Sequence, residues 1–336
     1  MIHSQSRDPI DNILSQLPAC PDDSRPFFRD LLQRFPKVRE GFQEFLAIPP
    51  EQRINAAAKK LQTTPRSGWQ RFSLPADFRD VLSTHSGEYY GPRFLLFEAS
   101  KGIESVLEHS AEAQELFLLV FENHSHICRQ WGAEVLKFHD FVEAITGDFK
   151  PGDITKPEKI FLEEMALELL TAGRKTGNLL AKHIYNCMQI FEGQAQNFAS
   201  LSSSMLDSIA QQHKSGQIGP HQQTFVNFLE KIYQGEGPDL EQLKTMTGDI
   251  DSLQMLLAGR RFIHKRSYSV DGPTLIKEWT EFVSYIKDKI KTDEAKLFCQ
   301  VFQEYFHSDS PEHMVVAEAF TEYSHRLGEA LAGRPA

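Results

Sequence analysis

The sequence predicts an all-α protein, because helical spacing of apolar residues runs through nearly all of it. Runs that alternate apolar and polar residues and are rich in β-branched side chains, which are typical of strands, are nearly absent. Hydrophobic residues make up 40% of the 336 residues and charged residues 24%, so the chain can bury a core of ordinary size. We therefore expect a globular helical fold.

The first predicted helical segment covers residues 26–47 and ends before two consecutive prolines, where the proline ring blocks continuation of a helix. Residues 62–92 follow a less regular pattern, because Pro, Gly, Ser and Thr interrupt them repeatedly. We place a domain boundary near residue 85. Residues 1–84 are thus predicted to form an N-terminal helical extension.

Residues 200–222 contain three consecutive serines and a Gly-Pro pair, so they are predicted to form either a frayed helix or a surface insertion. The helical pattern then resumes towards the C-terminus. We predict a central domain over residues 85–265, with an insertion near residues 200–240. Residues 266–336 are predicted to be a C-terminal helical extension.

The charge balance limits the class of partner. There are 36 basic and 46 acidic residues, which gives a net charge of −10 and argues against binding a nucleic-acid polymer or an anionic membrane. The four cysteines form no Cys-x-x-Cys pair, so neither a disulfide framework nor a structural zinc site is indicated. No segment has the apolar length of a membrane span or the pattern of a secretory signal, and we expect a cytoplasmic location.

Two predicted helices, at residues 104–123 and 131–146, each place a histidine within an apolar stripe. These histidines are His109 and His139, and Asp140 follows the second one directly. A lone inward histidine is usually a core residue, but a buried carboxylate beside it is costly unless it is paired or bound to a metal. On a continuous helix Glu143 would lie one turn beyond both, which gives imidazole and carboxylate groups suited to Mn²⁺, Co²⁺, Fe²⁺ or Zn²⁺.

These residues lie in two motifs. Residues 104–110 read Glu-Ser-Val-Leu-Glu-His-Ser, and residues 139–148 read His-Asp-Phe-Val-Glu-Ala-Ile-Thr-Gly-Asp. The pair of motifs resembles the HD-domain metal-dependent phosphohydrolases, in particular their 5′-deoxynucleotidase-like branch. The resemblance covers about residues 90–160 and implies an HD-domain helical core between the two extensions.

The resemblance also implies one divalent metal, either Mn, Co, Mg, Fe or Zn. Its ligands would be His109, His139, Asp140 and an aspartate further along the chain. The family places that aspartate in an Asp-x-Leu pattern, which Asp251 fits best. Asp249 is the alternative.

A phosphate-binding arginine beside an aromatic residue precedes the first motif in this branch of the family. Arg93 and Phe94 occupy the corresponding place, although the family usually has tryptophan where Phe94 stands. A guanidinium suits phosphate because it donates two parallel hydrogen bonds. Arg66, in an Arg-Ser-Gly-Trp segment, is a competing candidate.

The activity implied by the resemblance is release of phosphate from a nucleoside monophosphate or a similar small phosphate monoester. Glu143 and Asp148 are then the candidate catalytic acids. Two alternatives stay open: a phosphodiesterase or other nucleotide hydrolase on the same scaffold, and a degenerate HD protein with a regulatory or interaction role. The two extensions could cover the core, form a homodimer or narrow the pocket.

Overall fold

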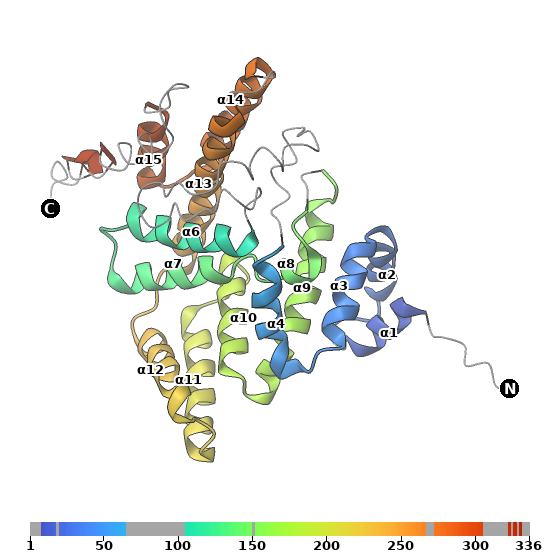
Figure 1. Ribbon diagram of the computed structural model, residues 1–336. Helices are drawn as coiled ribbons and strands as arrows, with labels where there is room; N and C mark the ends of the chain where they lie inside the picture. The colour runs from blue at the N-terminus through green and yellow to red at the C-terminus, as the bar shows by residue number, and fades with distance from the viewer. Residues whose placement is uncertain are drawn as a thin grey trace.

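All regular structure of the described residues is helical in the computed structural model, and these residues contain no β-strand (Figure 1). The described residues are 8–17, 20–64, 105–149, 152–266, 272–304, 322–323, 325–327 and 329–330. The prediction of an all-α fold is confirmed. No helix among these residues is long and apolar enough to cross a membrane.

Four helices pack together at the centre of the molecule: α6 (Val106–Val120), α7 (His126–Phe138), α10 (Leu179–Phe191) and α13 (Leu240–Arg266). Figure 1 shows α6 and α7 lying side by side. Their contact is close because the ring of Phe117 occupies the space that a Cβ at Gly132 would fill. The start of α6 is defined by a capping box, in which the Ser105 hydroxyl accepts from the Glu108 amide (3.2 Å) and the Glu108 carboxylate accepts from the Ser105 amide (2.7 Å).

The prediction of one continuous helix over residues 131–146 is wrong. Helix α7 begins earlier, at His126, and ends at Phe138; a turn follows, and the short helix α8 spans Glu143–Thr146. The imidazole Nδ1 of His139 lies 2.7 Å from the carbonyl oxygen of Leu136, an atom that a continued helix would offer to the backbone amide of Asp140. His139 and Asp140 therefore lie in a turn between two helices.

The N-terminal residues form the helices α1 (Pro9–Gln16), α2 (Arg25–Arg34), α3 (Pro36–Leu46) and α4 (Arg53–Leu61), with the short 3-10 helix η1 (Pro50–Gln52) before α4. The predicted helical segment is thus divided before Pro36. Both α3 and α4 pack on α8. Gly41 of α3 approaches α8 so closely that a Cβ there would overlap the backbone carbonyl of Ile145. The boundary predicted near residue 85 lies outside the described residues.

The remaining helices surround this centre. They are α9 (Lys156–Leu170), the 3-10 helix η5 (Ala172–Thr176), α11 (Phe198–Ser215), α12 (Pro220–Gln234), α14 (Gly272–Lys289) and α15 (Asp293–Glu304). Helix α9 packs on α8, while α14 and α15 pack on α13. Helices α11 and α12 form a hairpin in the region of the predicted insertion, so residues 200–222 lie mostly in regular helices.

Candidate metal centre

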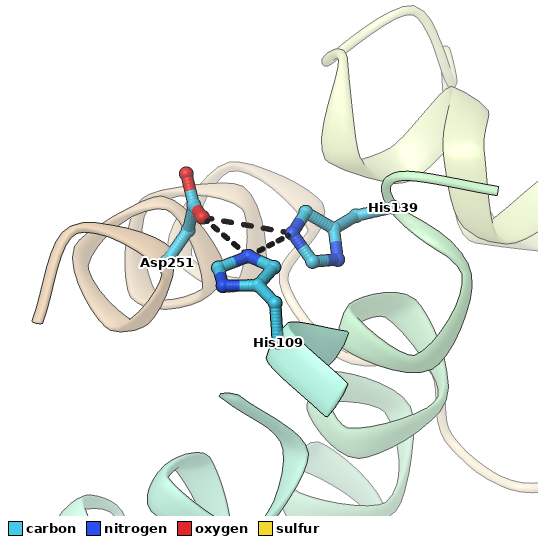
Figure 2. Close-up of side chains that lie close together, drawn as sticks. All are labelled: His109, His139 and Asp251. Carbon is cyan, nitrogen blue, oxygen red and sulfur yellow. Dashed lines mark hydrogen bonds and ion pairs between the residues drawn. The ribbon is translucent and has the colours of Figure 1, made fainter. Parts of the chain in front are cut away.

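Side chains from three separate segments converge beside the turn after α7 (Figure 2). The Nε2 atoms of His109 and His139 lie 3.1 Å apart. Oδ1 of Asp251 lies 3.0 Å from Nε2 of His109 and 3.6 Å from Nε2 of His139. Oδ2 of Asp140 lies 3.4 Å and 3.2 Å from the same two atoms. The two imidazoles and the Asp251 carboxylate therefore face one another, and the Asp140 carboxylate lies beside both imidazoles.

Hydrogen bonds on the far side of each ring fix the tautomers. The carbonyl oxygen of Leu136 can only accept, so Nδ1 of His139 carries the proton. The side-chain amide of Gln254 donates to the Glu112 carboxylate at 3.0 Å, which turns its carbonyl oxygen towards Nδ1 of His109 at 2.5 Å. In their neutral forms both histidines thus direct a bare Nε2 lone pair towards each other. Such outer hydrogen bonds are typical of histidines that bind a metal.

The distances fit a divalent ion. Ligand atoms about 2.1 Å from a common ion lie about 3.0 Å apart at right angles and about 3.4 Å apart at tetrahedral angles. The separations between the histidine nitrogens and their nitrogen and oxygen neighbours run from 3.0 to 3.6 Å. Two nitrogen lone pairs facing each other at 3.1 Å repel unless a cation or a proton lies between them. His109, His139 and Asp251 therefore form a candidate metal site, and Asp140 lies within reach of it.

Burial and neighbouring charges shift the pKa values of His139 and Asp251 in opposite directions. Burial lowers the pKa of His139, but the carboxylates of Asp140 and Asp251 raise it by more, so the net shift is upward. Burial raises the pKa of Asp251, while contacts with the two imidazoles hold it well below its usual range. An ion entering the cluster would compete with a proton, so metal affinity should increase with pH.

Asp249 lies elsewhere, although it is only two residues from Asp251 on α13. Its carboxylate accepts hydrogen bonds from the backbone amides of Lys291 (3.0 Å) and Thr292 (2.7 Å), and from the Thr292 hydroxyl (2.7 Å). Asp249 therefore fixes the segment between α14 and α15. The structure places Asp251, and not Asp249, beside the two histidines.

The other predicted site residues fall into two groups. Glu143 begins α8 and is buried, and Asp148 follows the helix directly after Gly147, whose φ of 68° suits glycine. Arg93, Phe94 and the competing Arg66 lie outside the described residues.

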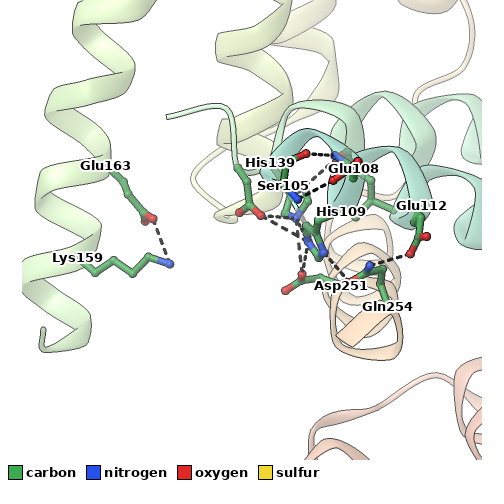
Figure 3. A network of polar contacts seen from close by, with 11 residues as sticks. Ser105, Glu108, His109, Glu112, His139, Lys159, Glu163, Asp251 and Gln254 are labelled. Carbon is green, nitrogen blue, oxygen red and sulfur yellow. Dashed lines mark hydrogen bonds and ion pairs between the residues drawn. The ribbon is translucent and has the colours of Figure 1, made fainter. Parts of the chain in front are cut away.

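Three residues of the surroundings were not predicted. Gln254 lies one turn after Asp251 and orients His109, whereas Lys159 and Glu163 lie on α9 and extend towards the cluster (Figure 3). Burial lowers the pKa of Lys159, but nearby carboxylates raise it by more, so the net shift is upward. The carboxylates that raise it belong to Glu163, Glu143, Asp140 and Asp148. Because a Lys–Glu pair at i, i+4 is common on exposed helices, nothing in the sequence indicates that this pair faces the site.

Comparison with protein families agrees with the geometry. Residues 93–246 match the family model described as HD domain. This match supports an HD-domain protein, and HD domains bind divalent metals. The match covers a little under half of the chain, contains His109, His139 and Asp140, and ends before Asp251. Neither a curated protein nor a solved structure matches the chain.

Proposed function

We propose that this protein is a metal-dependent phosphohydrolase that releases phosphate from a nucleoside monophosphate or a similar small phosphate monoester. The observation that carries the proposal is the convergence of His109, His139 and Asp251 at mutual distances suited to one divalent ion, with the Asp140 carboxylate beside both histidine Nε2 atoms. The HD-domain match supports a hydrolase of this general kind.

In this proposal His109, His139, Asp140 and Asp251 hold the ion. When bound, a divalent ion acts as a Lewis acid on a phosphoryl oxygen and lowers the pKa of water. The hydrogen bonds to Leu136 and Gln254 place the Nδ1 proton on the outer side of each ring, so that Nε2 is the atom each neutral imidazole would offer to the ion, and they fix the ring planes. The protein thereby maintains a preorganised site before the substrate arrives.

Glu143 and Asp148 are assigned the proton transfers. Hydrolysis of a phosphate monoester requires a proton to leave the attacking water and a proton to reach the departing alkoxide oxygen. Both carboxylates follow the His139–Asp140 turn closely in sequence, and both raise the pKa of Lys159. We assign one carboxylate to each transfer. The predicted phosphate-binding role of Arg93 and the packing role of Phe94 remain part of the proposal.

The test is a phosphate-release assay with metal-stripped protein, to which Mn²⁺, Co²⁺ or Mg²⁺ is added. The substrates are a panel of ribo- and deoxyribonucleoside monophosphates, with bis-p-nitrophenyl phosphate and a cyclic nucleotide to detect phosphodiesterase activity. We expect metal-dependent release from monoesters, and a loss of at least about 100-fold in kcat/KM for Asp140→Ala. Absence of turnover with every metal would overturn the proposal. Preference for the diesters would also overturn it and would favour a phosphodiesterase instead.

Asp249→Asn is a matched control for Asp251→Asn, because both residues are aspartates of α13 and neither substitution changes side-chain size. We expect Asp251→Asn to lose bound metal and activity. Asp249→Asn should keep the metal stoichiometry, because its carboxylate contacts Lys291 and Thr292 instead. Loss of metal in the Asp249 variant alone would show that the wrong aspartate has been assigned.

A further inference from the structure

Helix α9 directs a lysine and a glutamate towards the metal centre (Figure 3). Lys159 and Glu163 are one turn apart, and Nζ of Lys159 lies 3.3 Å from Oε1 of Glu163. The Lys159 side chain is 37% exposed and that of Glu163 is 18% exposed. The ammonium group thus extends from α9 towards the cluster on a side chain that solvent can still reach.

Stability does not explain this arrangement. An i, i+4 Lys–Glu pair on a helix surface contributes only about 0.3–0.5 kcal/mol. Burial raises the pKa of Glu163 to about 7, despite the opposing effect of Lys159, so ionised Glu163 is costly in the folded protein. A pair that costs stability at the edge of a candidate active site is better explained by a role in binding.

The charge of the site points to the ligand. Lys159 is influenced by the carboxylates of Asp140, in the turn, and of Glu143 and Asp148, which follow it. A phosphate dianion approaching these carboxylates is repelled, even when the ion in the cluster has been neutralised by Asp140 and Asp251. An ammonium group carries three donors, and the contact with Glu163 uses one direction of approach. It can therefore donate to a phosphate oxygen while keeping Glu163 as a neighbour.

Lys244 is the strongest competing cation. It lies on α13, but it precedes Asp251 by two helical turns, which corresponds to about 10 Å along the axis. Its Nζ lies against Gly193, just beyond the end of α10, where it would overlap a Cβ at that glycine. Lys244 therefore lies on α13 about two helical turns before Asp251, with its ammonium group beside Gly193.

We propose that Lys159 binds the phosphate group of the substrate, and that Glu163 is a positioning residue that holds its ammonium group towards the metal centre. This inference deepens the proposed function and rests on it for the identity of the substrate. The phosphate would then be bound from α9 as well as by the ion.

The experiment measures binding of inorganic phosphate to the Mn²⁺-loaded protein by calorimetry, together with the KM for p-nitrophenyl phosphate. We expect Lys159→Met to weaken phosphate binding about 10- to 100-fold, as expected for loss of one charge-assisted hydrogen bond. Lys159→Arg should retain most of the affinity, and Glu163→Gln should weaken it less than Lys159→Met does. Mn²⁺ stoichiometry should stay unchanged in all three variants.

Lys175→Met is the surface control, because Lys175, on η5, pairs with Glu168 at 3.9 Å and its side chain is 62% exposed. Wild-type phosphate affinity in Lys159→Met, or a larger loss in Lys244→Met, would overturn the assignment. Loss of Mn²⁺ together with phosphate in Lys159→Met would also overturn it, because the residue would then be structural. If wild type binds phosphate but hydrolyses no monoester, the proposed function fails while the binding comparison still decides the role of Lys159.

Discussion

Replacing Glu163 with glutamine should make the metal-free protein more stable at neutral pH. Burial raises the pKa of this carboxyl from 4.5 to about 7. A raised pKa means that the protonated form stabilises the fold; this contribution is complete below about pH 4.5 and is lost as pH rises through about 7. Glutamine resembles the protonated form at every pH, so the Glu163→Gln variant keeps this stabilising contribution as pH rises.

The expected magnitude follows from the shift. One pKa unit corresponds to about 1.4 kcal/mol, so the shift of Glu163 amounts to roughly 3 kcal/mol at most. The free energy of unfolding of the variant should therefore equal that of wild type near pH 4 and exceed it by up to roughly 3 kcal/mol near pH 8. Urea unfolding of both metal-stripped proteins between these pH values measures the difference, in which titrating groups that do not interact with Glu163 cancel.

The matched control is Glu44→Gln, which removes the carboxylate of the more exposed ion pair with Lys60. We expect that variant to differ from wild type by less than about 0.5 kcal/mol at any pH. In the Lys159→Met variant, the pH range over which Glu163 loses its proton, and with it the stabilising contribution, should move to higher pH. The reason is that Lys159 lowers the pKa of Glu163. The reasoning is refuted if the difference for Glu163→Gln stays flat, or if wild type gains stability relative to the variant as pH rises.

Four further substitutions test the surroundings of the site. Gly41→Ala should destabilise the protein by about 1–3 kcal/mol in urea unfolding, because the new Cβ overlaps the Ile145 carbonyl. Gly248→Ala should stabilise it by about 0.5–1 kcal/mol, since alanine favours a helix and no described heavy atom lies within 4 Å of the new Cβ. Asp249→Ala should cost about 1–3 kcal/mol in the same assay and leave the Mn²⁺ stoichiometry unchanged. Gln254→Leu should lower Mn²⁺ affinity about 10- to 100-fold in a metal titration, because an imidazole loses its outer hydrogen bond.

Each of these predictions has a distinct failure. A neutral Gly41→Ala would mean that α3 and α8 can separate without cost, and a destabilising Gly248→Ala would mean that its face of α13 is covered. Metal loss in Asp249→Ala would connect that residue to the site. Unchanged metal affinity in Gln254→Leu would show that its contact with His109 does not matter for binding.

The sequence predicted the helices better than their ends. Apolar spacing located α6 correctly because its inward residues follow one uninterrupted helix. The same spacing continues from Phe138 to Ile145 across the turn, because the bonds from Phe141 to Phe138 and from Glu143 to Asp140 keep a tight helical course. Periodicity alone could not detect that the hydrogen-bond pattern changes there.

The candidate site shows a similar division. The motifs identified His109, His139 and Asp140, because these residues lie in two short segments with a recognisable pattern. The preference for Asp251 over Asp249 came only from the family's Asp-x-Leu pattern, because both lie among apolar residues of one helix and tertiary contacts are what distinguish them. Lys159 was missed because only its place on α9, opposite the turn, gives it a role beyond a surface charge.

The close approach at Gly41 bears on how small an independently working unit can be. At Gly41, α3 contacts α8 with no room for a Cβ. Because α8 directly follows the turn that carries His139 and Asp140, the position of this turn depends on residues far before the HD-domain match. The match also ends inside α13, before Asp251. An excised segment of residues 93–246 would therefore lack both the support beneath one part of the cluster and one of its carboxylates. We expect autonomous folding with an intact site only for a piece that extends at least from α3 to the end of α13.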